Sequence, residues 1–134
     1  MPTVLIVDDE PTNISVINSL LREEYRTLVA TSGKRALDIA HSAHPPDLIL
    51  LDVGMPEMDG YQVCQALKED PLTRHIPVIF TTGKTTLDDE LRGFEMGCAD
   101  YIHKPISPPV LKARVRTQML LIEANKKLRL LDPG

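Results

Sequence analysis

The sequence predicts an α/β domain with a doubly wound, five-stranded parallel sheet and helices on both of its faces. Two periodicities alternate along the chain: short apolar runs are each followed by a segment in which apolar residues recur every three or four positions. Proline and glycine fall between these segments, where turns are expected. The chain has 134 residues, the length of one ordinary domain. Repeated strand–helix units of this size favour a parallel sheet with right-handed crossovers.

Five apolar runs are predicted as the strands. They are unbroken rather than alternating, which is typical of strands buried on both faces of a parallel sheet. Each run stops abruptly before an acidic residue, a threonine or a Lys-Pro pair. The predicted strands are Val4–Val7, Thr27–Ala30, Leu48–Leu51, Val78–Phe80 and Ala99–Ile102.

Helical spacing separates these runs. Apolar residues three or four positions apart form a stripe, which is typical of a helix that packs on a core. The stripes are Ile14, Ile17 and Leu21; Ala36, Ile39, Ala40 and Ala43; Val63 and Leu67; and Leu87, Leu91 and Phe94.

The last helical segment, from Pro108 to Leu131, is longer than a fifth helix on the sheet requires. Its second half keeps a coiled-coil-like spacing, but two good heptads are too few to predict a coiled coil. Either this half frays in solvent, or it continues toward another domain, which is the interpretation we favour. We therefore expect a domain over residues 1–120 and an extension of the last helix over residues 121–134, acting as a linker to an output domain.

The composition argues against some classes of function. The chain is 43% hydrophobic and 25% charged, with a net charge of -4, so nucleic-acid binding by this segment is not expected. The N-terminus lacks the pattern of a signal peptide, and no apolar run is long enough to cross a bilayer, so we expect a cytoplasmic protein without membrane contact. Cys64 and Cys98 lack metal-site spacing and are expected to be buried thiols.

Polar residues follow four of the predicted strands. They are the acidic run Asp8–Asp9–Glu10, then Asp52, then Thr81–Thr82, and finally the pair Lys104–Pro105. Ligands of doubly wound sheets bind beyond the carboxyl ends of the strands, so these residues are expected to meet there. Closely packed carboxylates repel unless a positive charge offsets them, and oxygen-only ligands favour Mg2+ over zinc. The alternative for the first acids is a solvated turn capping the next helix.

Four segments in this order and spacing carry a family resemblance. LIVDDE, LLDVGMPEMDG, VIFTTGK and DYIHKP closely resemble motifs of the response-regulator receiver domains of two-component signalling, the CheY-like receiver family. The resemblance covers residues 3 to 120. It implies a flavodoxin-like (βα)5 fold with strand order 2-1-3-4-5, which agrees with the α/β fold predicted from periodicity.

The resemblance implies a phosphoacceptor beside a bound Mg2+ ion. Asp8 and Asp9 resemble the acidic pair that holds the metal, and Asp52 resembles the carboxylate that accepts the phosphoryl group and also contacts the ion. Two residues further on, the backbone carbonyl of Gly54 matches a fourth metal ligand. Because Gly54 has no side chain, nothing at this position shields the acceptor or directs water toward it.

Further residues match the catalytic and switch positions of receiver domains. Thr82, rather than Thr81, resembles the switch hydroxyl because it lies thirty positions beyond the acceptor. Lys104 resembles the lysine that pairs first with the acceptor and then with the phosphoryl group, and its bond to Pro105 is usually cis in the family. Tyr101 matches the aromatic residue that turns inward on activation.

The function implied is a phosphorylation-dependent signalling switch. A histidine kinase or a histidine phosphotransfer protein would donate the phosphoryl group, and the change would pass through Thr82 and Tyr101 to the surface of the fourth helix, fifth strand and fifth helix. Such a domain is not an enzyme in its own right and at most catalyses its own phosphorylation and dephosphorylation. The partners implied are the phosphodonor and an output domain or downstream protein, with a homodimer left open.

Two other functions compete with this interpretation. A magnesium phosphatase of similar topology would usually carry a second acid two residues after its nucleophile, where this chain has Gly54. A degenerate receiver that acts only as a docking module would not be expected to keep the acidic residues, threonine and lysine together. Separately, His41 and His44 lie one helical turn apart, but with no evident carboxylate or Cys partner we expect an exposed helix end rather than a metal site.

Overall fold

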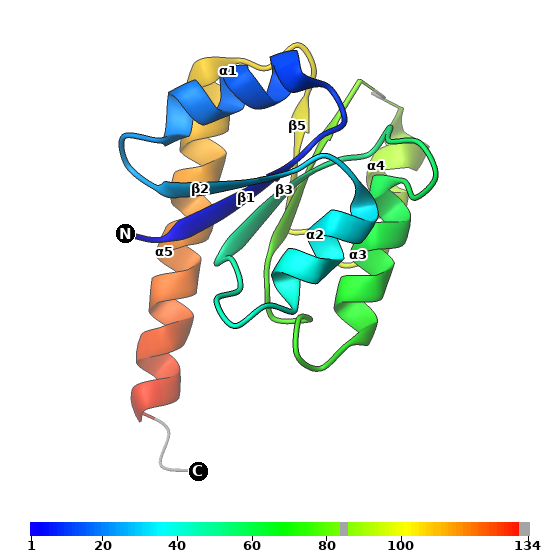
Figure 1. Ribbon diagram of the computed structural model, residues 1–134. Helices are drawn as coiled ribbons and strands as arrows, with labels where there is room; N and C mark the ends of the chain where they lie inside the picture. The colour runs from blue at the N-terminus through cyan, green and yellow to red at the C-terminus, as the bar shows by residue number, and fades with distance from the viewer. Residues whose placement is uncertain (84–85, 132–134) are drawn as a thin grey trace.

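Strands and helices alternate along the chain in the computed structural model, which describes residues 1–83 and 86–131. In this part of the chain five strands alternate with five helices (Figure 1). The elements are β1 Thr3–Val7, α1 Pro11–Leu21, β2 Arg26–Ala30, α2 Gly33–Ala40, β3 Leu48–Asp52, α3 Gly60–Glu69, β4 Val78–Thr82, α4 Leu87–Glu95, β5 Asp100–His103 and α5 Pro108–Leu131. Each predicted strand is present, with ends that differ by one or two residues because hydrogen-bonded pairing also takes in polar residues.

The strands form one parallel sheet in the order β2-β1-β3-β4-β5, which confirms the predicted doubly wound fold. The chain builds outward from β1 in one direction to β2 and in the other through β3 to β5. This reversal of strand order lies between β1 and β3, where such sheets form their ligand sites. Val7 pairs with Leu51, so the residues that follow them, Asp8 and Asp52, lie side by side at the carboxyl edge of the sheet.

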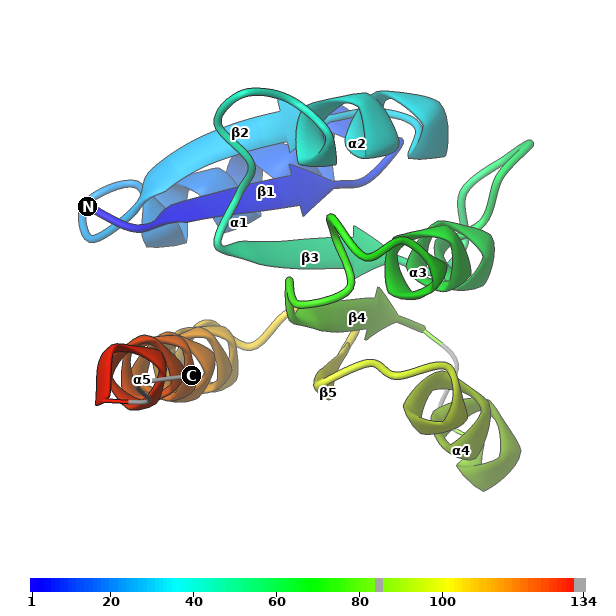
Figure 2. The same ribbon diagram turned by 90° about the horizontal axis from the view of Figure 1, so that it is seen from below.

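Alternate residues of the buried strands supply two separate cores. Figure 2 shows α2 and α3 on one face of the sheet and α1 with α5 on the other. The first core joins strand residues such as Leu5, Leu51 and Phe80 to α2 and α3, whereas the second joins Val4, Ile6 and Leu50 to α1 and α5. Because both faces are covered, the strand interiors are apolar at every position, as the unbroken runs predicted.

Local signals set the helix starts near the site. Asp59 caps α3 by accepting a hydrogen bond from the Gln62 amide, and the Gln62 side chain accepts one from the Asp59 amide in return. Gly60 then passes so close to β3 that a Cβ there would lie 2.5 Å from the carbonyl oxygen of Asp52. The glycine is therefore required for α3 to begin directly beside the end of β3.

Helix α4 differs from its predicted packing. The helix is present, but the apolar stripe of Leu87, Leu91 and Phe94 faces solvent, with 69%, 49% and 49% of these residues exposed. The buried residue of this helix is Gly93. Helical spacing therefore indicated the helix correctly, but it did not indicate which face of α4 the fold covers.

Helix α5 continues unbroken from Pro108 through Leu131. Its first half is buried through Leu111, Val115 and Met119, and Ile122 still packs against the same core. Further along, Lys126 lies 3.6 Å from Asp47, while the terminal apolar residues are exposed. The helix shows no break at residue 120, where we predicted the domain to end. Residues 132–134 of the predicted linker lie outside the described part of the chain.

Two expectations from composition concern membranes and thiols. In the described ranges, no helix is both long and apolar enough to cross a bilayer. Cys64 and Cys98 are buried free thiols, as predicted. Burial raises the pKa of both thiols, that of Cys98 to about 12, so neither is a reactive thiolate near neutral pH.

Candidate functional site

The carboxyl edge of the sheet brings together three carboxylates from two neighbouring strands. Asp8 and Asp9 follow β1, and Asp52 ends β3. One oxygen from each carboxylate lies within 4.8 Å of the others. Asp8 and Asp52 are buried, with 1% and 4% of their surface exposed, whereas Asp9 is more open to solvent. The sequence therefore predicted this cluster correctly.

The two oxygens of Asp8 have different surroundings. Oδ1 accepts a hydrogen bond of 2.9 Å from the amide of Glu10. Oδ2 is buried and has no hydrogen-bond partner among the described residues. Burial raises the pKa of Asp8, and the nearby negative charge of Asp52 raises it further, partly offset by the Glu10 hydrogen bond and by Lys104. An unsatisfied buried carboxylate oxygen of this kind favours a bound cation.

Lys104 brings a positive charge to this edge. Its Nζ donates a 2.9 Å hydrogen bond to Oδ1 of Asp52 and lies 3.6 Å from Oδ2 of Asp8. Burial alone would lower the pKa of Lys104, but its bond to Asp52 and the two negative charges outweigh burial and raise the pKa. The lysine is therefore charged at neutral pH. The bond between Lys104 and Pro105 is cis, as the resemblance implied.

Space beside Asp52 is left open by Gly54. The amide of Gly54 lies 3.4 Å from Oδ1 of Asp52, and a Cβ added at this glycine would meet no atom within 4 Å. The Asp52 carboxylate is thus held from one side by Lys104, while no side chain of residue 54 covers it. The predicted metal contact of the Gly54 carbonyl stays a prediction.

The two predicted switch residues, Thr82 and Tyr101, lie on the strands β4 and β5. Thr82 is 2% exposed at the end of β4, and its carbonyl accepts a hydrogen bond from the amide of Lys104. Tyr101 of β5 is 4% exposed, and its hydroxyl donates a 2.7 Å hydrogen bond to the carbonyl oxygen of Asp89 in α4. Its ring contacts Phe80 and Phe94. Tyr101 therefore lies inward, between the sheet and α4.

Gly93 is a residue that sequence reasoning missed. A Cβ at this position in α4 would collide with the hydroxyl of Tyr101. The inward position of the tyrosine therefore requires glycine opposite it. The available signal was a glycine inside a helical stripe, where it costs about 1 kcal/mol relative to alanine and usually has a packing reason.

The expectation for His41 was wrong in one respect. We found no carboxylate partner in the sequence, but Nε2 of His41 lies 2.7 Å from Oδ2 of Asp70, and Nδ1 contacts the carbonyl of Leu37. Asp70 follows α3 and is 29 positions away, so the pair depends on the packing of α2 against α3. The hydrogen bond to Asp70 raises the pKa of His41. The site is an interhelical ion pair at the surface, with no metal cluster around it in residues 1–83 and 86–131.

The donor set of the acidic edge fits a hard divalent cation. It offers carboxylate oxygens from Asp8, Asp9 and Asp52 and neither sulfur nor imidazole. Mg2+ prefers oxygen ligands and usually keeps several waters, which suits a cluster with one side open. The buried oxygen of Asp8 that lacks a hydrogen bond is the observation that supports the fit.

Fold and site together define a doubly wound α/β domain with three carboxylates clustered at its carboxyl edge and a lysine paired to Asp52. The chain belongs to the response regulator receiver domain family, which it matches over residues 4–116. The family resemblance predicted from the four motifs is thereby confirmed. Receiver domains of this family take phosphoryl groups from histidine kinases and bind Mg2+ at an acidic pocket. A receiver domain of this family is not an enzyme by itself.

Several known proteins are similar to this chain. A Vibrio cholerae protein named "Probable cyclic di-GMP phosphodiesterase" is 52% identical over 117 residues, which are 87% of this chain and 26% of that protein. The polar-differentiation response regulator DivK of Brucella ovis is 44% identical over 108 residues, 80% of this chain and 87% of DivK. Among solved structures, the signal receiver domain of a signal transduction histidine kinase from Syntrophus aciditrophicus has a TM-score of 0.80 at 39% identity, covering 88% of this chain and 89% of that one.

The similar proteins differ greatly in length. This chain spans about a quarter of the length of the first two curated relatives that it matches, but 87% of DivK. A receiver domain therefore occurs both as part of long proteins and nearly alone. The phosphodiesterase name belongs to a protein of which this chain matches 26%.

Proposed function

We propose that Asp52 is the phosphoacceptor of this receiver domain and that a histidine kinase or a histidine phosphotransfer protein is its donor. The observation that carries the proposal is the buried Asp52 carboxylate, which is hydrogen-bonded to Lys104 and lies beside the carboxylates of Asp8 and Asp9. An isolated buried carboxylate would be costly, but one held by a lysine next to a cation site is poised for nucleophilic attack.

The reaction transfers a phosphoryl group from nitrogen to oxygen. An oxygen of Asp52 forms a bond to phosphorus while the bond between phosphorus and the imidazole nitrogen of phosphohistidine breaks. The leaving imidazole keeps the electron pair and takes up a proton from solvent. Such transfers depend mostly on positioning and on neutralising the charge of the phosphoryl oxygens. Because a Cβ at Gly54 would meet no described atom within 4 Å, residue 54 leaves room for the donor near the acceptor.

Asp8, Asp9, Asp52 and the backbone carbonyl of Gly54 would hold Mg2+ in this proposal. The ion, when bound, supplies positive charge that offsets both the carboxylates and the incoming phosphoryl oxygens. Asp8 contributes the oxygen that lacks a hydrogen-bond partner. Because Lys104 already pairs with Asp52, it can remain in place and transfer its hydrogen bond to the phosphoryl group after the reaction.

The signal would leave the site through Thr82 and Tyr101. A phosphoryl group adds about -1.5 to -2 of charge at Asp52, and the Thr82 hydroxyl at the end of the adjacent strand would turn toward it. The contact between Tyr101 and the Asp89 carbonyl links β5 to α4. We propose that it stabilises the activated packing of α4, β5 and α5, the surface that an output domain or downstream protein would recognise.

The segment from residue 121 onward would connect this surface to an output domain. Its support is the continuous helix α5, together with relatives that are about four times as long as the matched segment. The receiver would then occupy residues 1–120 and the linker residues 121–134, with Ile122 still packed against the core of the receiver.

Treatment with acetyl phosphate and Mg2+, followed by intact-mass measurement, tests the proposed acceptor. We expect one added phosphoryl group on the wild-type chain, none on Asp52→Asn, and an unchanged addition on Asp88→Asn, because Asp88 is an exposed residue of α4. Addition to Asp52→Asn at the wild-type rate would exclude Asp52 as the acceptor. Sustained turnover of a phosphomonoester would instead indicate a phosphatase, and no response of any variant would indicate a docking module.

A further inference from the structure

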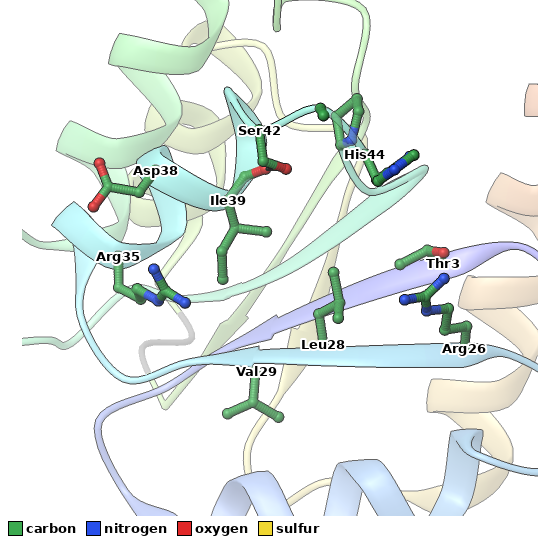
Figure 3. Close-up of a pocket in the computed structure, with 11 residues that line it drawn as sticks. Thr3, Arg26, Leu28, Val29, Arg35, Asp38, Ile39, Ser42 and His44 are labelled. Carbon is green, nitrogen blue, oxygen red and sulfur yellow. Dashed lines mark hydrogen bonds between the residues drawn. The ribbon is translucent and has the colours of Figure 1, made fainter.

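A groove lies on the far side of the sheet from α5, between the edge strand β2 and helix α2. It has a volume of about 650 Å³, and the residues that line it include Thr3, Arg26, Leu28, Arg35, Asp38 and Ile39. The proposed phosphoacceptor, metal ligands and switch residues do not line it. Figure 3 shows Leu28 and Ile39 pointing toward each other across the groove, so its floor is apolar.

Two guanidinium groups flank this apolar floor. In Figure 3, Arg35 extends from α2 toward β2 at one end, and Arg26 lies beside Thr3 at the other. Over residues 1–83 and 86–131, neither arginine has an ion pair or a side-chain hydrogen bond. Asp38 also lines the groove, but it forms no ion pair with Arg35 and points away from it. Unpaired arginines are notable on a chain with a net charge of -4, and they favour an anionic partner.

The floor of the groove borders an open strand edge. Among the described strands, β2 is the last of the sheet on this side, and its one partner is β1. The amide of Arg26 donates to Pro2, and the carbonyl of Ala30 accepts from Asp8, so residues 26, 28 and 30 direct their peptide groups toward β1. The peptide groups of Thr27 and Val29 therefore face outward. An open edge with outward N–H and C=O groups is a template for an added strand.

We propose that this groove binds an extended acidic segment of another protein, which adds as a strand to β2 and places its carboxylates against Arg26 and Arg35. The outward peptide groups of Thr27 and Val29 supply the main-chain hydrogen bonds. An apolar residue between the two acids covers Leu28. A second copy of this chain is a poorer occupant, because pairing β2 with β2 would bring the arginines of both copies together.

The probe is the capped peptide Glu-Thr-Val-Thr-Glu, whose alternation puts both glutamates and the valine on one face. Nitrogen-15 NMR titration should shift the amides of Thr27 and Val29 and the guanidinium signals of Arg26 and Arg35. The double variant Arg26→Gln/Arg35→Gln should bind roughly tenfold more weakly because the charge pairs are lost. Arg116→Gln, an exposed charge on α5, should bind like the wild type, and the peptide Lys-Thr-Val-Thr-Lys should not bind.

A backbone variant separates strand addition from simple charge attraction. Val29→Pro removes an outward amide while leaving the β1 ladder intact, and proline is tolerated on strand edges of this kind. It should abolish binding of the acidic peptide. If Val29→Pro does not fold, the arginine variant still decides the question.

Three outcomes would overturn the proposal. The first is the absence of shifts at Thr27 and Val29 up to the solubility limit of the peptide. The second is binding of inorganic pyrophosphate that moves the arginine signals as strongly as the peptide and leaves these amides unmoved, which indicates a small-anion site. The third is a dimer of the wild-type chain that Val29→Pro dissociates, which makes a second copy the occupant.

Discussion

Neighbouring carboxylates at the carboxyl edge of the sheet differ in how their charge is balanced. Asp52 has a direct hydrogen bond to Lys104, whereas the second oxygen of Asp8 is buried without a hydrogen bond from any residue that the structure describes. Burial raises the pKa of Asp8 above its ordinary value of 3.8, so the folded chain favours the neutral acid. In the absence of a cation, Asp8 therefore reduces stability, and the loss grows as pH rises from the ordinary pKa through the raised one.

The variant Asp8→Asn should consequently stabilise the metal-free chain at pH 7 by about 1 kcal/mol, because it removes a buried, repelled charge and keeps the acceptor for the Glu10 amide. Urea denaturation with and without Mg2+ measures this. The gain should shrink as pH is lowered toward 3.8, where the wild-type carboxyl is neutral. Mg2+ should stabilise the wild type but much less the variant. Equal stabilisation of both by Mg2+ would remove Asp8 from the proposed ligand set.

His41 and Asp70 provide a second prediction. The hydrogen bond between them raises the pKa of His41, so the pair stabilises the fold fully below pH 6.5 and loses this effect as pH rises through the folded-state pKa. NMR titration should give His41 a pKa above 6.5 in the wild type and a value closer to 6.5 in Asp70→Asn. Asp88→Asn, on α4, should leave the titration of His41 unchanged. An unshifted pKa in the wild type would show that the pair does not persist in solution.

Strands and helices could be predicted where the spacing of apolar residues along the sequence reflects which of their faces are buried. The unbroken apolar runs indicated all five strands because both faces of a parallel sheet are covered. Strand order came from the family resemblance, since periodicity carries no information on which strands are neighbours. The same limit explains the error at α4: the spacing of Leu87, Leu91 and Phe94 is that of a packed face, yet this face is exposed in the fold.

Contacts between residues that are far apart in the sequence were a second limit on what could be predicted. The proximity of Asp8, Asp52 and Lys104 could be predicted from the sequence, because all three lie at the carboxyl ends of strands of one parallel sheet. His41 with Asp70, and Lys126 with Asp47, depend on how helices and loops pack, and no sequence period encodes that. Gly93 was missed for the same reason, because its partner Tyr101 lies on a different element.

The contact between α4 and β5 should be sensitive to one methyl group. In Gly93→Ala the new Cβ would collide with the Tyr101 hydroxyl, so the tyrosine must leave its hydrogen bond to Asp89 or α4 must shift. We expect a loss of about 1–3 kcal/mol in the free energy of unfolding and a more exposed tyrosine by ultraviolet difference spectroscopy. Gly83→Ala is the matched control, because a Cβ at Gly83 meets no atom of the described residues within 4 Å. Equal effects of the two substitutions would contradict this account of Gly93.

At the scale of the whole molecule, α5 joins the domain to whatever lies beyond it. The helix packs on the sheet through Met119 and Ile122, and its later turns carry the exposed residues Leu128, Leu130 and Leu131. The packed part therefore extends just past the boundary at residue 120 that motif spacing suggested.

Two truncations locate this boundary. A chain ending at residue 120 should lose about 1 kcal/mol of stability relative to the full chain, because the partly buried Ile122 is removed. A chain ending at residue 127 keeps Ile122 and Lys126 and should unfold like the full chain in urea. The exposed pair of Lys126 and Asp47 should add little. Identical unfolding of both truncated chains would place the boundary at or before residue 120.

Helix α5 also sets a mechanical property of the domain. It begins after β5 at the carboxyl edge and runs back past the loops at the opposite edge without interruption (Figure 1). Its 24 residues make a rod about 36 Å long at 1.5 Å per residue. A tilt of roughly 5° at its first turn would therefore move its last turn by about 3 Å. The length of the helix would thus turn a change of angle that is small at the sheet into a displacement of atomic size at Leu131.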